Sequence, residues 1–109
     1  MPPYEWYNEE IVEWSNELGL TIINFSPGTR STADYTTDDA KNFVSSEAIF
    51  QSILKRERED PHGLNGFLLL LHLGAGPERS DKFHARFGEL LEVLSAKGYT
   101  FVRVDELLR

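Results

Sequence analysis

The chain has 109 residues and no cysteine, and its 18 acidic against 11 basic residues give a formal net charge of −7. The acidic excess argues against nucleic acid as a partner, because a phosphate backbone needs clustered Lys and Arg, and the lack of cysteine excludes disulfides and thiolate zinc sites. The length suits one domain over residues 1–109, and the longest apolar run, residues 67–71, is far too short for a membrane span.

The first predicted element is a helix over residues 9–18. Asn8 can cap its N-terminus, and the acidic residues of its first turn suit the positive end of the helix dipole. Gly19 follows as a stop signal. Three apolar residues recur at helical spacing and form one face: Ile11, Trp14 and Leu18.

A short β-branched run follows this helix, and it predicts a buried strand over residues 20–24. From residue 25 to residue 39 the composition changes to Ser, Thr, Pro, Gly and Asp, which predicts a long loop. Loops of this length are uncommon inside compact domains and are usually functional or disordered. We therefore treat residues 25–39 as a candidate functional segment.

The next helix can be capped by Ser45 or by Ser46, and Pro61 ends it. Its last turns carry the charge run "KRERED", which is most simply a solvated helix end with neighbouring opposite charges.

Two strands and two helices are predicted in the remaining chain. The apolar run of residues 66–72 is typical of a strand buried on both faces of a parallel sheet. Apolar residues at helical spacing predict a helix over residues 80–96. Residues 99–104 predict a third strand, and Asp105 can cap a short last helix.

This alternation of helices and strands predicts an α/β fold with a parallel sheet and right-handed crossovers. A complete (β/α) barrel has eight strands and about 250 residues, so the chain is predicted to be a partial (β/α) barrel. Exposed sheet edges invite pairing with another chain, and we therefore expect self-association.

In βα proteins the loops after the carboxyl ends of the strands carry the chemistry. This rule selects Asn24 with the long loop after it, and His72 with the loop after it. A histidine at a strand end can be a structural hydrogen-bonding residue or a catalyst, and both interpretations stay open. In the long loop, Asp34 and Asp39 are acid–base candidates, although a lone loop aspartate is usually solvated.

Two further patterns bear on possible binding sites. The three histidines match no metal-ligand spacing, so a metal trio is disfavoured. The aromatic side chains Tyr4, Trp6 and Tyr7 can line a sugar-binding surface, or they can be core residues of a barrel.

Three stretches, "PPYEWYN", "LLLLHLGAGPERSDKF" and "LEVLSAKGYTFVRVDELL", resemble the C-terminal part of a polysaccharide deacetylase domain, the NodB-homology carbohydrate esterases. The resemblance covers essentially the whole chain. It implies the C-terminal βα units of a polysaccharide deacetylase-like barrel. It also implies removal of N-acetyl or O-acetyl groups from an acetylated polysaccharide, with a divalent metal, usually zinc, activating a water molecule.

The resemblance assigns roles at the N-terminus. Pro3 and Tyr4 resemble the end of the family's Arg-x-Pro-Tyr motif, in which the tyrosine's backbone N–H helps to hold the oxyanion. The arginine of that motif would fall at position 1, where this chain has Met1.

A second set of roles follows from the family's Leu-x-His motif, which Leu70 and His72 resemble. In the family the leucine lines the pocket for the acetyl methyl, and the histidine is the general acid that protonates the leaving amine or alkoxide. Asp34 and Tyr35 resemble the family's Asp-Trp segment, which shapes the substrate groove.

The family's metal ligands and catalytic base belong to an Asp-Asp motif and a His-x-x-x-His motif that precede the Arg-x-Pro-Tyr segment. No Asp-Asp-Gly and no His-x-x-x-His occurs in these residues; Asp38-Asp39 is followed by Ala40 and lies after the Pro3-Tyr4 segment instead of before it. We therefore expect this chain alone to hold no cofactor and to be inactive. The alternative is a non-catalytic carbohydrate-binding or assembly module derived from the same fold.

The compartment is not specified by the sequence. The stretch "MPPYEWYNEE" has no basic region followed by an apolar one, so we expect no signal peptide within it. The family resemblance suggests an extracellular or cell-envelope location.

Overall fold

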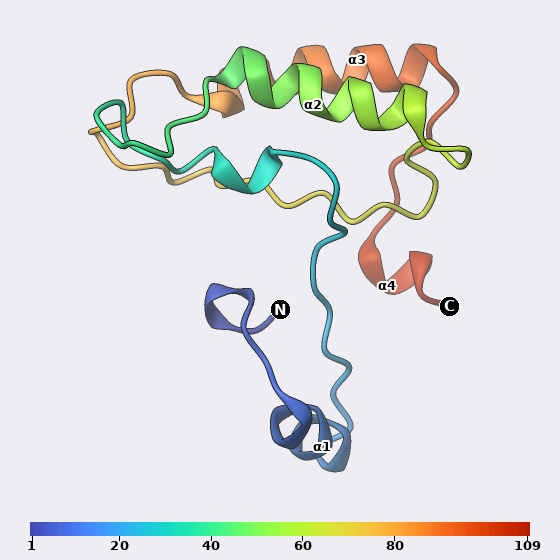
Figure 1. Cartoon of the computed structure of the whole chain (residues 1–109). Coiled ribbons are helices and arrows are strands. Elements are labelled where there is room, and N and C mark those ends of the chain that lie inside the picture. The colour runs from blue at the N-terminus through green and yellow to red at the C-terminus, as the bar shows by residue number, and fades with distance from the viewer.

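The computed structural model describes residues 1–109 and consists of helices joined by irregular segments, with no strand. Two long helices, α2 and α3, lie side by side above the rest of the chain (Figure 1). The α-helices are α1 (Glu9–Glu17), α2 (Ser46–Glu59), α3 (Phe87–Ala96) and α4 (Val104–Leu107), and the 3-10 turns are η1 (Pro3–Glu5), η2 (Ser31–Ala33) and η3 (Phe83–Arg86).

The helix ends follow the local signals. Asn8 caps α1, with its Oδ1 accepting a hydrogen bond of 3.0 Å from the N–H of Ile11. Ser45 caps α2 in the same way, accepting from the N–H of Ala48 at 3.1 Å. Gly98, with φ +95°, follows the end of α3 in a conformation that L side chains rarely adopt. These three boundaries confirm what the sequence indicates.

The predicted helix over residues 80–96 is divided in two. Its first part is the 3-10 turn η3, and α3 begins only at Phe87. The last helix, α4, begins at Val104, one residue before the predicted cap Asp105.

The core lies between α2, α3 and η3. Its seven members are Val44, Ile49, Phe50, Ile53, Phe83, Leu90 and Leu94. Leu69 and Leu71, from the segment below α2 and α3, pack against this cluster and are themselves partly exposed. No residue before position 31 and none after position 94 is buried, so both ends of the chain lie outside the core.

The predicted α/β fold class, a partial (β/α) barrel made of the C-terminal βα units of a polysaccharide deacetylase-like barrel, is wrong for this chain. The three expected strands, 20–24, 66–72 and 99–104, form no strand ladder and no sheet, so a TIM-barrel-like description is wrong as well. One main-chain bond of 2.9 Å, from Ser26 N–H to the carbonyl oxygen of Leu68, links the chain just after residues 20–24 to residues 66–72.

The physical reason is that a strand needs a neighbour on its open side. Isolated pairs of strands are at best marginal in water, and a parallel sheet needs cover on both faces. Within residues 66–72 only Leu69 and Leu71 pack against the core, and no residue of the segment is fully buried. The expectation that this segment is buried on both faces is therefore also wrong.

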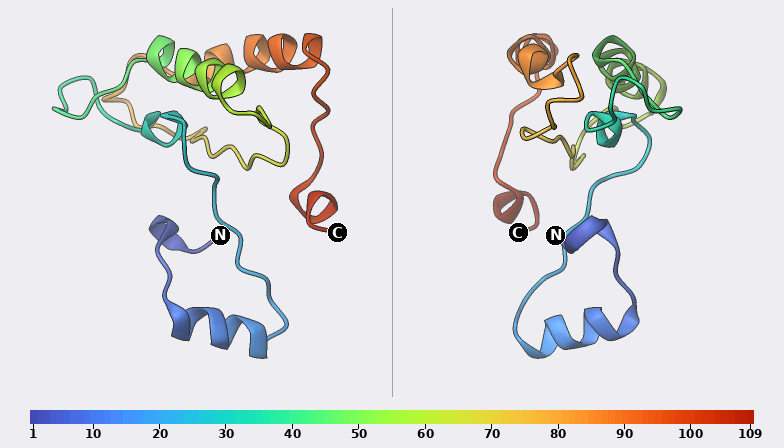
Figure 2. Two further views of the ribbon diagram at one scale, coloured as in Figure 1. Left: turned by 45° about the vertical axis from the view of Figure 1, so that its right-hand side comes forward. Right: turned by 90° about the vertical axis from the view of Figure 1, so that its left-hand side faces the viewer.

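The N-terminal residues form a lobe that stands apart from the core. The two further views show α1 at the far end of this lobe, with the chain returning to η2 as a single connection (Figure 2). The molecule accordingly measures 41 × 35 × 21 Å along its principal axes. None of its helices has the length and apolar character needed to cross a membrane.

Candidate functional site

Asp34 is the residue on which the candidate site is built. It terminates η2, where its N–H bonds the carbonyl oxygen of Ser31, and only 1% of it is exposed. The turn is held on its other side by Thr36, whose hydroxyl donates 2.7 Å to the carbonyl oxygen of Ala33. The long polar loop therefore places one carboxylate in the interior, which contradicts the general expectation that a loop aspartate is solvated.

The carboxylate of Asp34 contacts His72 at two points. Its Oδ1 lies 2.6 Å from Nδ1 of the imidazole, and its Oδ2 accepts a bond of 2.6 Å from the His72 backbone N–H. The two residues are 38 positions apart in the chain. A buried carboxylate needs such hydrogen bonds, because burial without them would cost several kcal/mol.

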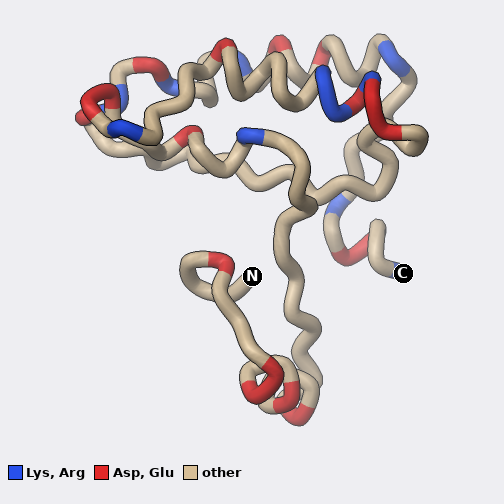
Figure 3. Tube along the Cα trace, viewed as in Figure 1, with Lys and Arg blue, Asp and Glu red and all other residues tan.

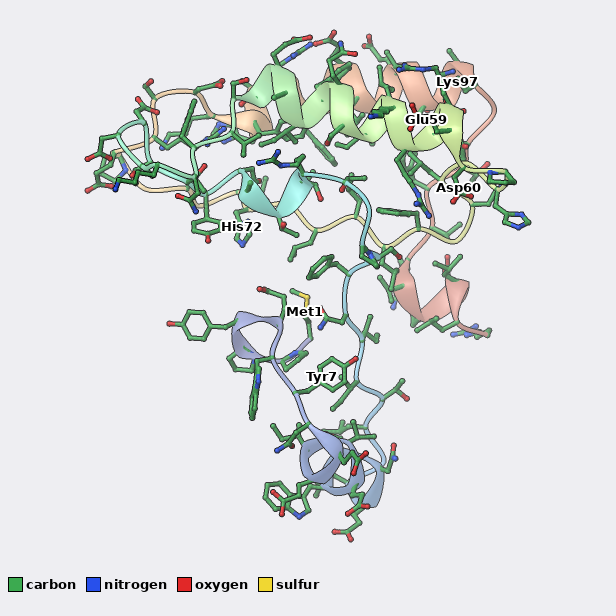
Figure 4. All side chains as sticks on the ribbon, in the orientation of Figure 1. Met1, Tyr7, Glu59, Asp60, His72 and Lys97 are labelled. Carbon is green, nitrogen blue, oxygen red and sulfur yellow. The ribbon has the colours of Figure 1, made fainter.

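This contact fixes the chemistry of the ring. A carboxylate oxygen can only accept, so Nδ1 carries the proton and Nε2 is the nitrogen available to a ligand. The His72 side chain is 36% exposed and makes no other hydrogen bond. Figure 4 shows it on the side of its segment that faces away from α2. The pair is an oriented imidazole with one free, accessible nitrogen.

Tyr35 forms the flank of the imidazole. Its ring meets the His72 ring edge to face, with centroids 5.3 Å apart and planes at 64°. Tyr35 is 55% exposed, so it leaves an aromatic surface beside the imidazole. The neighbouring residues Asp34 and Tyr35 are thus brought together with His72, which lies far from them in the sequence.

Leu70 lies two residues before His72, and both residues line one hollow in the surface of the molecule. This hollow has a volume of about 670 Å³, and 20 of its 26 lining residues are hydrophobic. Asp34 and His72 also line it, so the imidazole lies at the border of an apolar surface. That size falls in the range of small-molecule sites.

Pro3 and Tyr4 are not part of this constellation. They lie in η1 of the N-terminal lobe, where the Tyr4 side chain is 95% exposed and neither residue lines the hollow. Tyr4 nevertheless has an unusual main chain, with φ +56°, and its N–H makes no hydrogen bond. A non-glycine residue in this region costs free energy and is often found at functional sites.

A buried arginine that no sequence motif singles out supports the loop that carries Asp34. Arg79 is fully buried and donates to the carbonyl oxygens of Thr36 at 2.9 Å, Val44 at 2.9 Å and Asp81 at 2.6 Å. Its guanidinium also lies 5.0 Å from the centre of the Phe43 ring. Arg79 therefore ties residues 36–44 to residues 79–81.

Asp38 closes the outer end of the same loop. Both of its carboxylate oxygens lie 3.1 Å from the Ser80 backbone N–H. The Ser80 hydroxyl, followed by this N–H, lowers the pKa of Asp38 below its ordinary value of 3.8. The loop around Asp34 is thus fixed by contacts that are distant in sequence.

Metal ligands are not assembled among these residues. No group of three or more His, Cys, Asp or Glu side chains is placed to hold a metal ion. The donor set formed by Asp34 and His72 alone does not fit the zinc that the family resemblance implies, because zinc sites use three or four protein ligands.

Neither the Asp34–His72 contact nor the role of Arg79 has a local sequence signal. The partners are separated by 38 and 43 residues, and no spacing rule joins loop residues over such distances. The one weak sequence signal for the Asp34–His72 contact is the apolar run that precedes His72, because an imidazole in apolar surroundings needs a polar partner.

Comparison with known proteins adds no relative: no family model, no curated protein and no solved structure matches the chain.

Proposed function

We propose that this chain belongs to a metal-dependent polysaccharide deacetylase and supplies its general acid, His72. The observation that carries the proposal is the 2.6 Å contact between Asp34 Oδ1 and His72 Nδ1, which leaves Nε2 free at the border of an apolar hollow. A general acid needs such a ring, oriented by one nitrogen and reactive at the other.

In the proposed step, protonated Nε2 donates its proton to the leaving nitrogen or oxygen of the acetylated sugar as the bond to the acetyl carbon breaks. Asp34 accepts from Nδ1–H throughout, which keeps the ring in place. The nucleophilic water and its base are supplied from outside these residues. For this reason the isolated chain is expected to be inactive.

The remaining roles follow the resemblance. Leu70 lines the pocket for the acetyl methyl, and Tyr35 offers an aromatic surface to a sugar ring. The resemblance gives Pro3 and the main chain of Tyr4 a role in holding the oxyanion, but both residues lie in η1 outside the hollow, so this role rests on the resemblance alone. The resemblance also favours an acetylated polysaccharide as partner, zinc in the complete domain, and an extracellular or cell-envelope location.

A second candidate is a non-catalytic carbohydrate-binding or assembly module. It is favoured by the exposed aromatic side chains of the N-terminal lobe, since Tyr4, Trp6 and Trp14 are 95%, 64% and 58% exposed. Aromatic faces of this kind can stack on sugar rings.

The two candidates are distinguished by titrating the chain with N-acetylated chito-oligosaccharide and following imidazole and indole resonances by NMR. The deacetylase proposal expects the signals of His72 to shift and those of His62, which lies outside the hollow and serves as an internal control, to stay. Asp34→Asn should weaken the response at His72. Shifts confined to the Trp6 and Trp14 indoles would favour the binding module, and no shift at all would contradict both.

Catalysis is tested by acetate release from the same oligosaccharide, with and without added zinc, beside His72→Ala. We expect no release by the chain alone. Zinc-dependent release that His72→Ala abolishes would mean that these residues build a complete site, and the assignment of the metal and base to other residues would then be wrong.

A further inference from the structure

The turn that joins α2 to the apolar segment of residues 66–72 contains an asparagine followed directly by a glycine, Asn65-Gly66. The chain has five asparagines, and Asn65 is the one that precedes a glycine. Glycine has no Cβ beside its backbone nitrogen. This nitrogen can therefore approach the side-chain amide of the preceding asparagine without the steric hindrance that any other residue would add.

The side chain of Asn65 is exposed and makes no hydrogen bond. The side-chain contacts of this turn are made by other residues. Asp60 Oδ1 accepts a bond of 2.8 Å from the N–H of His62, and the Tyr99 hydroxyl accepts one of 3.0 Å from the N–H of Leu64. The amide carbon of Asn65 is therefore accessible and is not held in one position.

The backbone nitrogen of Gly66 is also free, although both of its neighbours are bonded. The N–H of Asn65 bonds the carbonyl oxygen of His62 at 3.1 Å, and the N–H of Phe67 bonds that of Leu64 at 3.1 Å. Gly66 itself makes no such bond, is exposed, and has no atom within 4 Å of the place where a Cβ would lie. Nothing in the fold keeps this nitrogen away from the Asn65 side chain.

Another asparagine of the same chain provides a comparison. Asn42 is exposed as well and makes no side-chain hydrogen bond. It is followed by Phe43, whose N–H is bonded to the carbonyl oxygen of Ala40 at 2.9 Å. The attacking nitrogen at this second site is thus both hindered by a side chain and engaged.

We propose that Asn65-Gly66 is a site of spontaneous modification, at which Asn65 is converted through a cyclic imide into aspartate and isoaspartate. The Gly66 nitrogen attacks Cγ of Asn65, and a new N–C bond forms as the bond from Cγ to the side-chain nitrogen breaks. That nitrogen leaves as ammonia and takes up the proton that the Gly66 nitrogen loses.

Water then opens the ring, and no oxidant or reductant takes part. Addition of water at Cγ breaks the bond from Cγ to the Gly66 nitrogen and gives aspartate. Addition at the main-chain carbonyl carbon of Asn65 breaks the bond from that carbon to the Gly66 nitrogen and gives isoaspartate. In the isoaspartate product the main chain runs through Cγ.

Both products change the surroundings of the apolar hollow. Residues 61–77 contain no Asp, Glu, Lys or Arg, and the tube is uncoloured along this part of the chain (Figure 3). Leu64 and Gly66, on either side of Asn65, line the hollow. The modification therefore places a negative charge beside an apolar surface, and isoaspartate also lengthens the main chain there. It is independent of the proposed catalytic role, because it involves neither the imidazole nor a substrate.

The test is to incubate the folded chain at physiological temperature in water enriched in heavy oxygen, and to map its peptides by mass spectrometry over time. We expect Asn65 to lose ammonia and to gain one heavy oxygen, with isoaspartate detected by an isoaspartate-specific methyltransferase. The rate should exceed that at Asn42 by roughly tenfold or more, because a Cβ and an engaged N–H together raise the barrier at the second site.

Two variants identify the reacting groups. Gly66→Ala should slow the reaction at Asn65 by roughly tenfold or more, since it adds a Cβ beside the attacking nitrogen. Asn65→Gln keeps an amide at this position but would have to form a larger ring, so its peptide should stay unmodified over the same time. Circular dichroism reports whether both variants retain the helices.

Equal rates at Asn65 and Asn42 in the unsubstituted chain would overturn the proposal. So would a reaction at Asn65 that occurs only after unfolding in urea, since the fold would then be protecting the site. These two results need no substitution and no carbohydrate, so they decide the matter even if Gly66→Ala fails to fold or the deacetylase proposal is wrong.

Discussion

Arg79 donates a hydrogen bond of 2.9 Å to the carbonyl oxygen of Thr36, a residue 43 positions earlier in the chain. This bond matters for the candidate site because Thr36 lies two residues after Asp34. The loop that carries the buried carboxylate is therefore held by a guanidinium from the segment that follows His72.

Arg79→Met should lower the free energy of unfolding by about 3 kcal/mol or more, because buried carbonyl groups then lose their donor. The measurement is urea denaturation followed by circular dichroism. Arg103→Met is the matched control: Arg103 is 77% exposed and paired with Asp105, and its loss should cost less than about 1 kcal/mol. Equal costs for the two variants would contradict the role given to Arg79.

Gly63→Ala should be more damaging than Gly66→Ala. Both glycines have positive φ, +59° and +69°, so each substitution strains the backbone by roughly 1 kcal/mol. At Gly63 a Cβ would also clash with the hydroxyl of Tyr99, whereas at Gly66 nothing lies within 4 Å of the added atom. The difference between the two unfolding free energies measures this clash.

The hydroxyl of Tyr99 accepts a bond of 3.0 Å from the N–H of Leu64, so the clash in Gly63→Ala would also displace this contact. Removing the hydroxyl in Gly63→Ala/Tyr99→Phe should restore part of the lost stability. If the double variant is no more stable than Gly63→Ala alone, the steric explanation is wrong.

Ser45→Ala should destabilise the chain by about 1 kcal/mol, since it removes the N-cap of α2. Ser95→Ala provides the control within a helix, because the Ser95 side chain is exposed and makes no hydrogen bond. There the higher helix propensity of alanine should leave stability unchanged or slightly raised. Thermal unfolding of the two variants side by side makes the comparison.

Asp38 makes stability depend on acidic pH. The pKa of Asp38 is lower in the folded chain than its ordinary value of 3.8. Its contribution to the free energy of unfolding is therefore complete at pH values above 3.8. This contribution is lost as the pH falls through the lowered pKa of the folded chain. The advantage of the wild type over Asp38→Asn should therefore be constant at neutral pH and vanish in strong acid.

Unfolding free energies of the wild type and Asp38→Asn, measured over a series of pH values, check this sign. Ser80→Ala removes the hydroxyl that contributes most to the lowered pKa of Asp38. It should reduce the pH-dependent part of the unfolding free energy, while the bond from the Ser80 backbone N–H to Asp38 remains. If the wild type gained stability over Asp38→Asn as the pH falls, the lowered pKa assigned to Asp38 would be contradicted.

The sequence by itself determined the features that depend on near neighbours. Asn8 and Ser45 cap helices whose hydrogen bonds close within four residues, and Gly98 ends α3 because of its own main-chain freedom. Asp34 and His72 are candidates from their places in the chain, whereas Tyr35 enters only through the family resemblance. The order in which helices follow one another needs no information beyond such local rules.

The tertiary structure alone decided whether the apolar runs become strands and which loop residues meet. A strand satisfies its main chain only through a partner, and residues 66–72 have core packing on one side and no such partner on the other. The same applies to the contact between Asp34 and His72 and to the bonds of Arg79, which join segments 38 and 43 residues apart. Such contacts exist because α2, α3 and the core bring the two loops together, and no local pattern encodes that approach.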